Sequence, residues 1–353
     1  MKIDVGVTPP YSIHVASNLL GSLARYIDET HIAIITDNTV GRLYAPMAKD
    51  ALAQAGKEFH CYCVAPGEQS KSLASFEHLL RQMVRDGFTR SAAVLALGGG
   101  VVGDLAGYVA ASFMRGVAFY QCPTSLLAMV DASIGGKTAI NMPEGKNLVG
   151  AFWQPRAVII DIGTLRTLPT KAFRHGAVEL FKHGLLANER LLESVRAEEF
   201  QPGGPPDFLI EAVAESAAVK ANIVVADERE TNLRATLNLG HTLGHALEAV
   251  SDHALPHGEA VAYGLYFAAV LAKNRGWKDL TPMVGDFLQW VQPAPLPTTE
   301  FERLESFLAR DKKRLSDRLR YVLLRGISKP VIVDDVTLQE QQAAWMELLE
   351  VAA

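Results

Sequence analysis

The chain has 353 residues, a formal net charge of −5 and 49% hydrophobic residues. This length suggests about two domains, and the hydrophobic content is sufficient for a core in each. The negative charge argues against nucleic acid or an anionic membrane surface as a general partner.

The start of the chain, MKIDVGVTPPYSIHV, contains no apolar signal core and predicts a first strand. The three cysteines, Cys61, Cys63 and Cys122, form no C-x-x-C pair, a usage that suits a reducing compartment. We therefore expect a cytoplasmic globular protein without a membrane partner.

The first half of the chain alternates short β-branched runs with helical segments. Strands are predicted at residues 31–37, 59–66 and 91–97, with helices at 43–55 and 76–86 between them. This alternation is typical of a parallel sheet covered by helices, so we predict an α/β domain.

A glycine loop follows the third of these strands. Gly98, Gly100 and Gly103 occupy the glycine positions of G-x-G-x-x-G, where backbone N–H groups can bind a pyrophosphate. A tight strand-to-helix turn without a ligand is the alternative. The loop departs from the usual fingerprint, because it lies near residue 100 and no acidic residue ends a strand about twenty residues later. Asp37, at the end of an earlier strand, could take the ribose role instead.

A segment rich in cations and glycine turns comes next. The sequence predicts a strand at 117–122, then a helix and a glycine turn. Polar and charged side chains interrupt the apolar stretches here, namely Arg115, Asp131, Lys137, Asn141, Lys146 and Asn147. Each could be a solvated surface residue, but several lysines beside glycine turns favour an anion-binding role.

The run 157–169 closes the sheet region, and the sequence after it is mostly helical. We therefore expect one domain at residues 1–170 and a second at 171–353. In the helix predicted at 176–186, Glu179 and Lys182 lie one turn apart on an apolar segment. They could form a simple i,i+3 ion pair, but a carboxylate buried there would need a partner or a bound metal.

The second half carries its most informative chemistry between residues 234 and 259. Polar residues there recur at intervals of three or four and would share one face of a helix. They are Arg234, Asn238, His241, His245 and Glu248. Gly240 and Gly244 would lie inside that helix, which suggests that another group approaches its backbone closely. The apolar run 260–272 is too short to span a bilayer and predicts a buried helix.

Two histidines four residues apart, such as His241 and His245, can bind one metal ion or simply form a polar stripe on a surface helix. The flanking glycines, and a further histidine at His257 before the buried helix, favour a metal site. The site of a zinc protease is excluded, because Thr242 replaces the general-base glutamate of H-E-x-x-H.

Several stretches resemble the 3-dehydroquinate synthases, sugar-phosphate cyclases of the shikimate pathway. LNLGHTLGHALE with LPHGEAVAYG is similar to their metal-binding signature, and PTSLLAMVDASIGGKTAIN with GKNLVGAFWQP matches them almost position by position. GGGVVGD is similar to a cofactor loop that they share with iron-dependent alcohol dehydrogenases. The resemblance implies a Rossmann-like α/β NAD-binding domain, a mainly α-helical metal-binding domain and a homodimer.

The implied reaction converts 3-deoxy-D-arabino-heptulosonate 7-phosphate to 3-dehydroquinate and phosphate. Carbon 5 is transiently oxidised by NAD, phosphate leaves by β-elimination, the hydride returns, and an intramolecular aldol step closes the ring. Such a site needs a Lewis acid, a fixed nicotinamide, and cations for one phosphate and one carboxylate.

The resemblance also implies roles for particular residues. The metal ligands, for zinc or cobalt, would be Glu179, His241 and His257. The substrate residues would be Asp131, Lys137, Lys146, Asn147, Lys182, Lys220, Arg234, Asn238, His245, Lys312 or Lys313, and Arg115 of the partner subunit. The NAD residues would be Asp37, Glu68, Gln69, Ser70, Lys71, Gly99, Gly100, Val101, Val102, Gly103, Asp104, Thr124, Ser125, Lys137, Lys146, Thr164, Leu165, Arg166 and Thr167. His245, one turn beyond a metal ligand, would transfer a proton at carbon 5.

Two other functions remain open from the sequence. An iron-type polyol dehydrogenase would share the glycine loop and a histidine metal site, but it would not need so many cations directed at phosphate. Another sugar-phosphate cyclase would carry out similar chemistry on a different sugar.

Overall fold

The computed structural model describes residues 1–230, 233–252, 254–315 and 319–352, apart from the side chains of residues 309–315. The chain forms two compact units. The first joins Met1–Phe173 with Glu198–Glu228, and the second joins Arg174–Ala197 with Arg229–Ala353. This division differs from the single boundary expected at residue 170, because helix α6 (Pro206–Ala226) returns to pack on the first two strands of the sheet.

The first unit is built on a seven-stranded sheet with the order β1-β2-β9-β6-β5-β3-β4. Its strands are β1 (Lys2–Val5), β2 (Tyr11–Ala16), β3 (His31–Asp37), β4 (Glu58–Val64), β5 (Ala93–Gly98), β6 (Ala118–Pro123) and β9 (Ala157–Asp161). Strand β1 pairs antiparallel with β2, and every other pairing in this sheet is parallel. The predicted α/β class is therefore confirmed. Parallel strands of this kind place their carboxyl ends at one edge, where ligands commonly bind.

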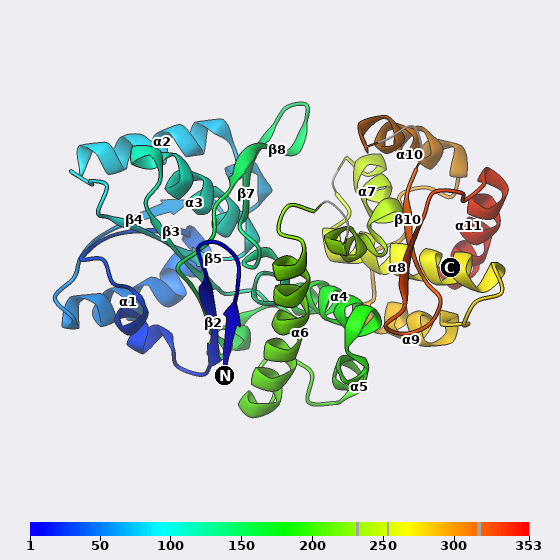
Figure 1. The fold of residues 1–353 in the computed structure, drawn as a ribbon, viewed down its shortest axis with the longest axis horizontal. Coiled ribbons are helices and arrows are strands. Elements are labelled where there is room, and N and C mark those ends of the chain that lie inside the picture. Colours follow the sequence, from blue (N-terminus) through cyan, green and yellow to red (C-terminus); the bar gives the residue numbers. More distant parts are fainter. Residues whose placement is uncertain (231–232, 253, 316–318, 353) are drawn as a thin grey trace. The chain divides into compact units, whose positions relative to one another are not determined.

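Helices cover both faces of this sheet (Figure 1). The helices of the unit are α1 (Asn38–Gln54), α2 (Leu73–Arg85), α3 (Gly100–Ser112) and α6, joined by the short helical turns η1 (Leu20–Tyr26), η2 (Glu68–Ser70), η3 (Phe113–Arg115), η4 (Ala128–Ala132) and η5 (Ile162–Thr167). One core lies between the sheet and α2 and α3, and the other lies between the sheet and η1 and α1. Strand β5 is buried along its whole length, which explains its nearly continuous apolar sequence.

A separate antiparallel hairpin packs against α3 in the first unit. Its strands are β7 (Lys137–Met142) and β8 (Gly145–Phe152). The sequence indicated only a glycine turn here, because polar residues interrupt the apolar pattern of both strands. Gly150 permits the pairing, since a Cβ at this position would lie 2.0 Å from the carbonyl oxygen of Thr138.

The second unit is mainly helical, as predicted. Its elements are α4 (Thr170–Ala187, shared with the first unit at its start), α5 (Glu189–Arg196), η6 (Leu233–Asn238), α7 (His241–Val250), α8 (His257–Asn274), α9 (Thr281–Val291), α10 (Phe301–Leu315), α11 (Leu338–Ala352) and the hairpin of β10 (Tyr321–Leu324) with β11 (Pro330–Val333). Helix α8 is buried continuously from Gly258 to Ala272 and contacts α7, α9, α11 and β10. The predicted buried helix is therefore the centre of this unit.

The helix expected to run continuously from Arg234 is interrupted at Gly240, so that expectation is wrong. Gly240 has a left-handed backbone (φ +79°) and lies between η6 and α7. A Cβ on the neighbouring Gly264 would lie 1.8 Å from the Gly240 carbonyl oxygen. The close approach inferred from the glycines is therefore made by α8, and α7 begins directly at His241.

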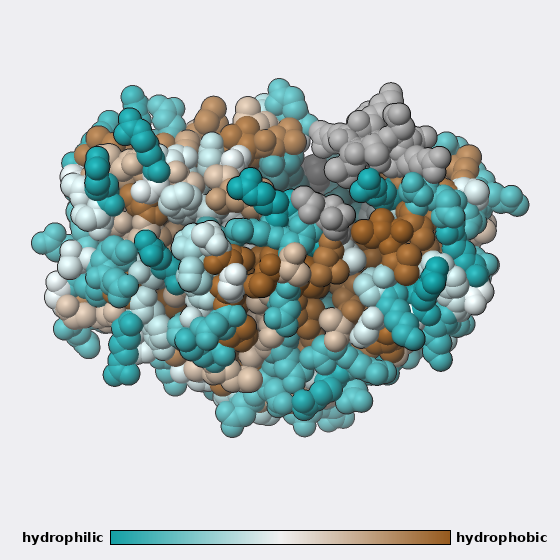
Figure 2. All heavy atoms as spheres, in the orientation of Figure 1, coloured by the Kyte–Doolittle hydropathy of each residue, from teal (hydrophilic) through white to brown (hydrophobic). Residues whose placement is uncertain are grey.

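Hydrophilic side chains dominate much of the face shown in Figure 2, with smaller hydrophobic areas between them. Among the described residues, no helix has both the length and the apolar composition needed to cross a membrane.

Candidate functional site

The second unit brings together the three predicted metal ligands. Helix α4 supplies Glu179, while His241 and His257 are the first residues of α7 and α8. Nε2 of each histidine lies 3.7 Å from Glu179 Oε1, and one ligand atom from each residue lies within 4.8 Å of the others. Two nitrogens and a carboxylate in this arrangement suit a catalytic zinc-type ion that keeps a further position open.

The remaining nitrogen of each histidine ring is held by a neighbour. Nδ1 of His241 lies 3.1 Å from the carbonyl oxygen of Leu239, and Nδ1 of His257 lies 3.2 Å from Glu248 Oε2. Both partners are acceptors, so each ring donates from Nδ1 and presents Nε2 to the Glu179 carboxylate. Such contacts orient the rings of metal-bound histidines and increase their basicity.

The electrostatics of the triad also favour a bound cation. Burial acts to raise the pKa of Glu179, but Lys182, His257 and His241 hold it well below its ordinary value. Burial and the Lys182 ammonium hold the pKa of His241 well below its usual range, so this ring is neutral, as a ligand must be. Burial alone would lower the pKa of His257, but Glu179 and Glu248 raise it to about 10. Carboxylates that favour a proton on His257 also favour a metal ion in its place.

Glu179 itself provides the test of fit for a metal. Its side chain is fully buried and forms an ion pair with Lys182, one turn along α4. Among the described residues, none donates a well-oriented hydrogen bond to either carboxylate oxygen. Because buried carboxylates are normally satisfied, these two oxygens fit a site at which a divalent cation would be bound.

A second buried carboxylate, Glu259, supports the triad and was not singled out from the sequence. It lies two residues after His257 and is fully buried. One of its oxygens lies 2.8 Å from Nε2 of His175, on the helix that carries Glu179, and the other accepts a hydrogen bond from the Ala294 backbone N–H at 2.7 Å. Glu259 therefore connects the start of α8 to α4. The sequence feature that could have pointed to Glu259 is its charge at the start of a long apolar run.

The other polar residues predicted to share one helix face differ in how far they are buried. Arg234 in η6 is buried, with 2% of its surface exposed, whereas His245 is exposed and its ring centre lies 5.4 Å from that of His241. Asn238 donates a hydrogen bond to Glu230 at 3.1 Å, and this carboxylate was not predicted as a site residue from the sequence. The side chains of Lys312 and Lys313 lie outside the described residues.

In the first unit, the glycine loop lies at the carboxyl end of β5, where α3 begins. Gly99 precedes the first residue of α3 and provides no side chain to cap it, so the first N–H groups of α3 are directed toward the space beyond the helix. A Cβ on Gly103 would lie 2.8 Å from the Gln121 side chain, which explains the third glycine by close helix–strand packing. This geometry fits the pyrophosphate of a dinucleotide.

Lys71 connects the loop to other predicted ligand residues. Its ammonium, which is buried, contacts both the Asp104 carboxylate and the Asn147 side-chain oxygen. Burial raises the pKa of Asp104, and the Lys71 ammonium acts in the opposite direction. The structure thus joins two predicted NAD residues with one predicted substrate residue.

The remaining NAD candidates lie near the carboxyl ends of the strands or in the turns that follow them. Asp37 Oδ1 caps α1 by accepting from the N–H groups of Thr39 and Val40 at 2.8 and 2.9 Å. Glu68, Gln69 and Ser70 form η2, Thr124 and Ser125 follow β6, and Thr164, Leu165, Arg166 and Thr167 belong to η5. Val101 and Val102 are in the first turn of α3. The side chains of Val102 and Leu165 are buried in the protein core, so these two can offer a cofactor only their backbone.

The predicted substrate residues of the first unit include one fixed pair. The ammonium of Lys220, on α6, donates to the side-chain carboxylate of Asp131 and to the backbone carbonyl oxygen of Asp131, both at 2.6 Å. Lys137 and Lys146 lie on the β7–β8 hairpin. Arg115 is exposed in η3 and has a left-handed backbone (φ +68°).

Comparison with known proteins gives consistent matches along the chain. The model for the 3-dehydroquinate synthase N-terminal region matches residues 61–175, and the model for the C-terminal region matches residues 176–314. The chain is 43% identical to the 3-dehydroquinate synthase of Xanthomonas campestris pv. campestris (strain 8004), over 99% of this chain and 97% of that protein. It is also 43% identical to the 3-dehydroquinate synthase of Symbiobacterium thermophilum, over 93% and 94% of the two chains.

A solved structure with the same fold is ValA, a 2-epi-5-epi-valiolone synthase from Streptomyces hygroscopicus subsp. jinggangensis 5008 with NAD+ and Zn2+ bound. The two proteins are 29% identical and superpose with a TM-score of 0.88, over 96% of this chain and 97% of ValA.

Proposed function

Since the chain belongs to the 3-dehydroquinate synthase family, we propose that it converts 3-deoxy-D-arabino-heptulosonate 7-phosphate to 3-dehydroquinate and phosphate. The observation that carries this proposal is the ligand set Glu179, His241 and His257, in which each histidine is oriented by a second group. The enzyme is a lyase that depends on NAD and on a divalent metal, zinc or cobalt.

When bound, NAD accepts and returns the hydride at carbon 5, while the metal polarises the oxygen on that carbon. Glu179, His241 and His257 of the second unit would hold the ion. His245, one turn beyond His241 and exposed, moves the proton at carbon 5. In the first unit, the N–H groups at the start of α3 bind the pyrophosphate. The Glu68–Lys71 turn, Asp37, the Thr124–Ser125 pair and the Thr164–Thr167 turn contact the rest of the cofactor.

The substrate carries a phosphate and a carboxylate, and cationic side chains of this chain are suited to bind these groups. Arg234 is suited to this role, because a buried guanidinium can bind a carboxylate or phosphate through two parallel hydrogen bonds. Lys220 is held in one position by Asp131, so its ammonium is already placed before a ligand arrives. Lys137, Lys146, Asn147, Lys182 and Asn238 complete this assignment, together with Lys312 or Lys313.

Two rival functions are less well supported. An iron-type polyol dehydrogenase has no anionic substrate for these cations. A cyclase for a different sugar, such as ValA, is 29% identical to this chain, whereas 3-dehydroquinate synthases reach 43% over nearly its full length.

A cytoplasmic homodimer is also part of the proposal. Arg115 is exposed on the first unit, so it is accessible to the substrate of a partner subunit. Cys61, Cys63 and Cys122 are all free thiols, in keeping with a reducing compartment.

The direct test supplies purified protein with NAD, zinc and the heptulosonate phosphate, and identifies the product by mass spectrometry and NMR. We expect 3-dehydroquinate. Turnover of another sugar phosphate, with none of the heptulosonate phosphate, would assign the chain to a different cyclase.

A further inference from the structure

Asn141 occupies an irregular position in the β7–β8 hairpin. The ladder runs from Lys137 opposite Phe152 to Ile140 opposite Val149, and its register shifts between Ile140 and Met142. The Asn141 N–H donates instead to the carbonyl oxygen of Lys71 at 2.8 Å. Bulges of this kind redirect a side chain and are frequent beside active sites.

The redirected side chain of Asn141 makes two further hydrogen bonds. Its Nδ2 donates to Glu68 Oε1 at 2.7 Å, and its Oδ1 accepts from the backbone N–H of Asn147 at 2.9 Å. The side chain at position 141 must therefore both donate and accept a hydrogen bond. The amide of asparagine does both, whereas an ionised carboxylate only accepts.

Asn147, the residue held by Asn141, has an unusual backbone conformation. Its φ is +58°, in the left-handed region that non-glycine residues rarely adopt. Asn141 fixes its N–H, and the Lys71 ammonium contacts its side-chain oxygen while also pairing with Asp104. Strained conformations held from several sides are typical of ligand-binding positions.

We propose that Asn141 is a positioning residue that connects the cofactor-binding turn Glu68–Lys71 to the part of the hairpin that carries Lys146 and Asn147. Through these bonds, NAD bound at the turn stabilises the hairpin conformation that receives the substrate, and loss of Asn141 weakens the binding of both. This inference rests on the proposed function for the identity of the two ligands. In physical terms, the side-chain amide of Asn141 couples the binding of one ligand to the binding of the other.

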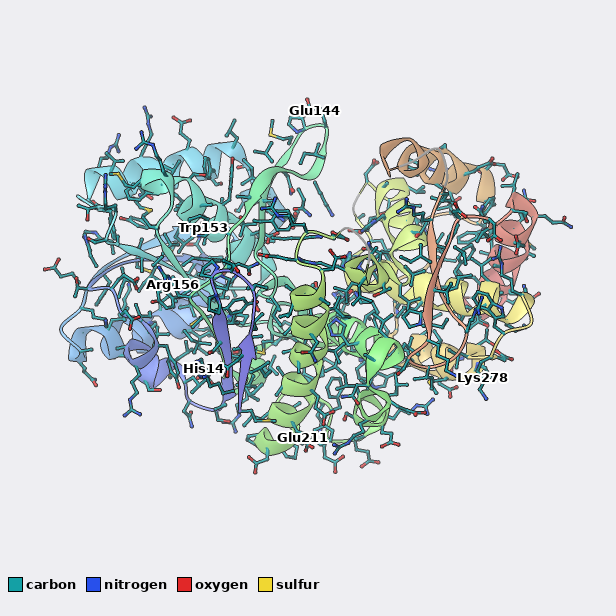
Figure 3. All side chains as sticks on the ribbon, in the orientation of Figure 1. His14, Glu144, Trp153, Arg156, Glu211 and Lys278 are labelled. Atoms are coloured by element: carbon teal, nitrogen blue, oxygen red, sulfur yellow. The ribbon has the colours of Figure 1, made fainter. Side chains whose placement is uncertain are left out.

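The test uses the full chain with Asn141→Ala and Asn141→Asp, and Glu144→Gln as the matched control. Glu144 lies at the exposed tip of the same hairpin (Figure 3). The measurements are the NAD Kd of the free enzyme by calorimetry, the KM for the heptulosonate phosphate at saturating NAD, kcat and Tm.

Asn141→Ala is expected to raise both the NAD Kd and the substrate KM about tenfold, the factor that follows from losing one or two hydrogen bonds. Asn141→Asp is expected to raise both at least as much, because its carboxylate faces that of Glu68. Glu144→Gln should leave both constants within about twofold of the parent values. In a double-mutant cycle with Asn147→Ala, the effects on KM should not add, because Asn141 acts through Asn147.

A lower Tm for Asn141→Ala with unchanged Kd and KM would reduce Asn141 to a structural connection and overturn the inference. A change in KM alone, or strict additivity with Asn147→Ala, would also contradict it. Parent protein that binds NAD but forms no 3-dehydroquinate would refute the proposed function. The NAD Kd values of the three variants would still decide whether Asn141 positions the cofactor turn.

Discussion

Glu248 Oε2 lies 3.2 Å from Nδ1 of His257, so one residue near the end of α7 orients a ligand at the start of α8. The same helix α7 begins with the ligand His241, and its Gly244 packs against the backbone of α8 at Ala260 and Val261. Two ligands and one orienting carboxylate are therefore fixed by a single pair of closely packed helices.

Removal of this orienting contact should weaken metal binding without abolishing it. We expect Glu248→Ala to lower zinc affinity by about 10- to 100-fold, the usual effect of deleting such a contact to a metal-bound histidine. Competition with a chromophoric chelator measures this affinity. Glu248→Gln retains an acceptor oxygen and should lose less. Equal zinc affinity in Glu248→Ala and the parent protein would show that His257 needs no orientation.

Each of the three ligands should be required for the protein to retain one metal ion per chain. Chelator treatment is expected to abolish activity, and added zinc or cobalt should restore it. His257→Ala, which removes one of three ligands, should lose the metal in elemental analysis of the purified protein. A full equivalent of metal retained by this variant would refute the triad.

Much of the fold is predictable from local sequence patterns. Strand β3 begins and ends where the run HIAIITD predicts, because a buried parallel strand is continuously apolar. The break at Gly240 could not be predicted, since it depends on the contact with Gly264 on another helix. The return of α6 to the first unit depends likewise on packing against β1 and β2.

The metal ligands could be proposed from motifs, whereas their supporting residues could not. Glu248 was visible in the polar stripe, but its partner His257 lies on the next helix. Glu259 and His175 are far apart in the chain, and only the packing of α8 on α4 brings them to 2.8 Å. Asn141 gains its contacts from a shift in strand register, a feature that sequence periodicity does not reveal.

Loss of a cation that binds the substrate should appear in KM. Lys146→Ala and Arg234→Ala are each expected to weaken binding by about 1.5–3 kcal/mol, or roughly 10- to 100-fold in KM, the usual contribution of a hydrogen bond to a charged group. Steady-state kinetics with varied heptulosonate phosphate measure the effect. Arg81→Ala serves as the control, because Arg81 forms an exposed i,i+4 pair with Glu77. Unchanged kinetics in either variant would remove that residue from the substrate assignment.

Helix α11 contains a pH-dependent contribution to stability. Glu340 accepts a hydrogen bond from Arg275 and two more from the N–H and hydroxyl of Thr337. The Glu340 N–H donates in return to the Thr337 hydroxyl, so Thr337 and Glu340 form a capping box at the start of the helix. The hydrogen bond from Arg275, opposed by burial and aided by Thr337, lowers the pKa of Glu340 from 4.5 to about 2. Because the folded-state pKa is lowered, the stabilisation is complete above pH 4.5 and is lost as the pH falls toward 2.

We therefore expect Glu340→Gln to lower Tm by a constant amount above pH 4.5, and by a decreasing amount at lower pH. Thermal unfolding followed by circular dichroism across this range measures the difference. Glu350→Gln, near the exposed end of the same helix, is the matched control. A difference between parent and Glu340→Gln that grows as the pH falls would contradict the assigned direction.

The balance of phosphate and NADH tests the central claim most directly. The predicted set of substrate-binding cations favours a cyclase, in which NAD is required but is restored in each turnover. Phosphate release and absorbance of the reduced nicotinamide are followed together in one reaction with excess heptulosonate phosphate. We expect one phosphate per substrate consumed and no NADH beyond a single equivalent of enzyme. Steady accumulation of NADH without phosphate release would contradict the account and identify a dehydrogenase.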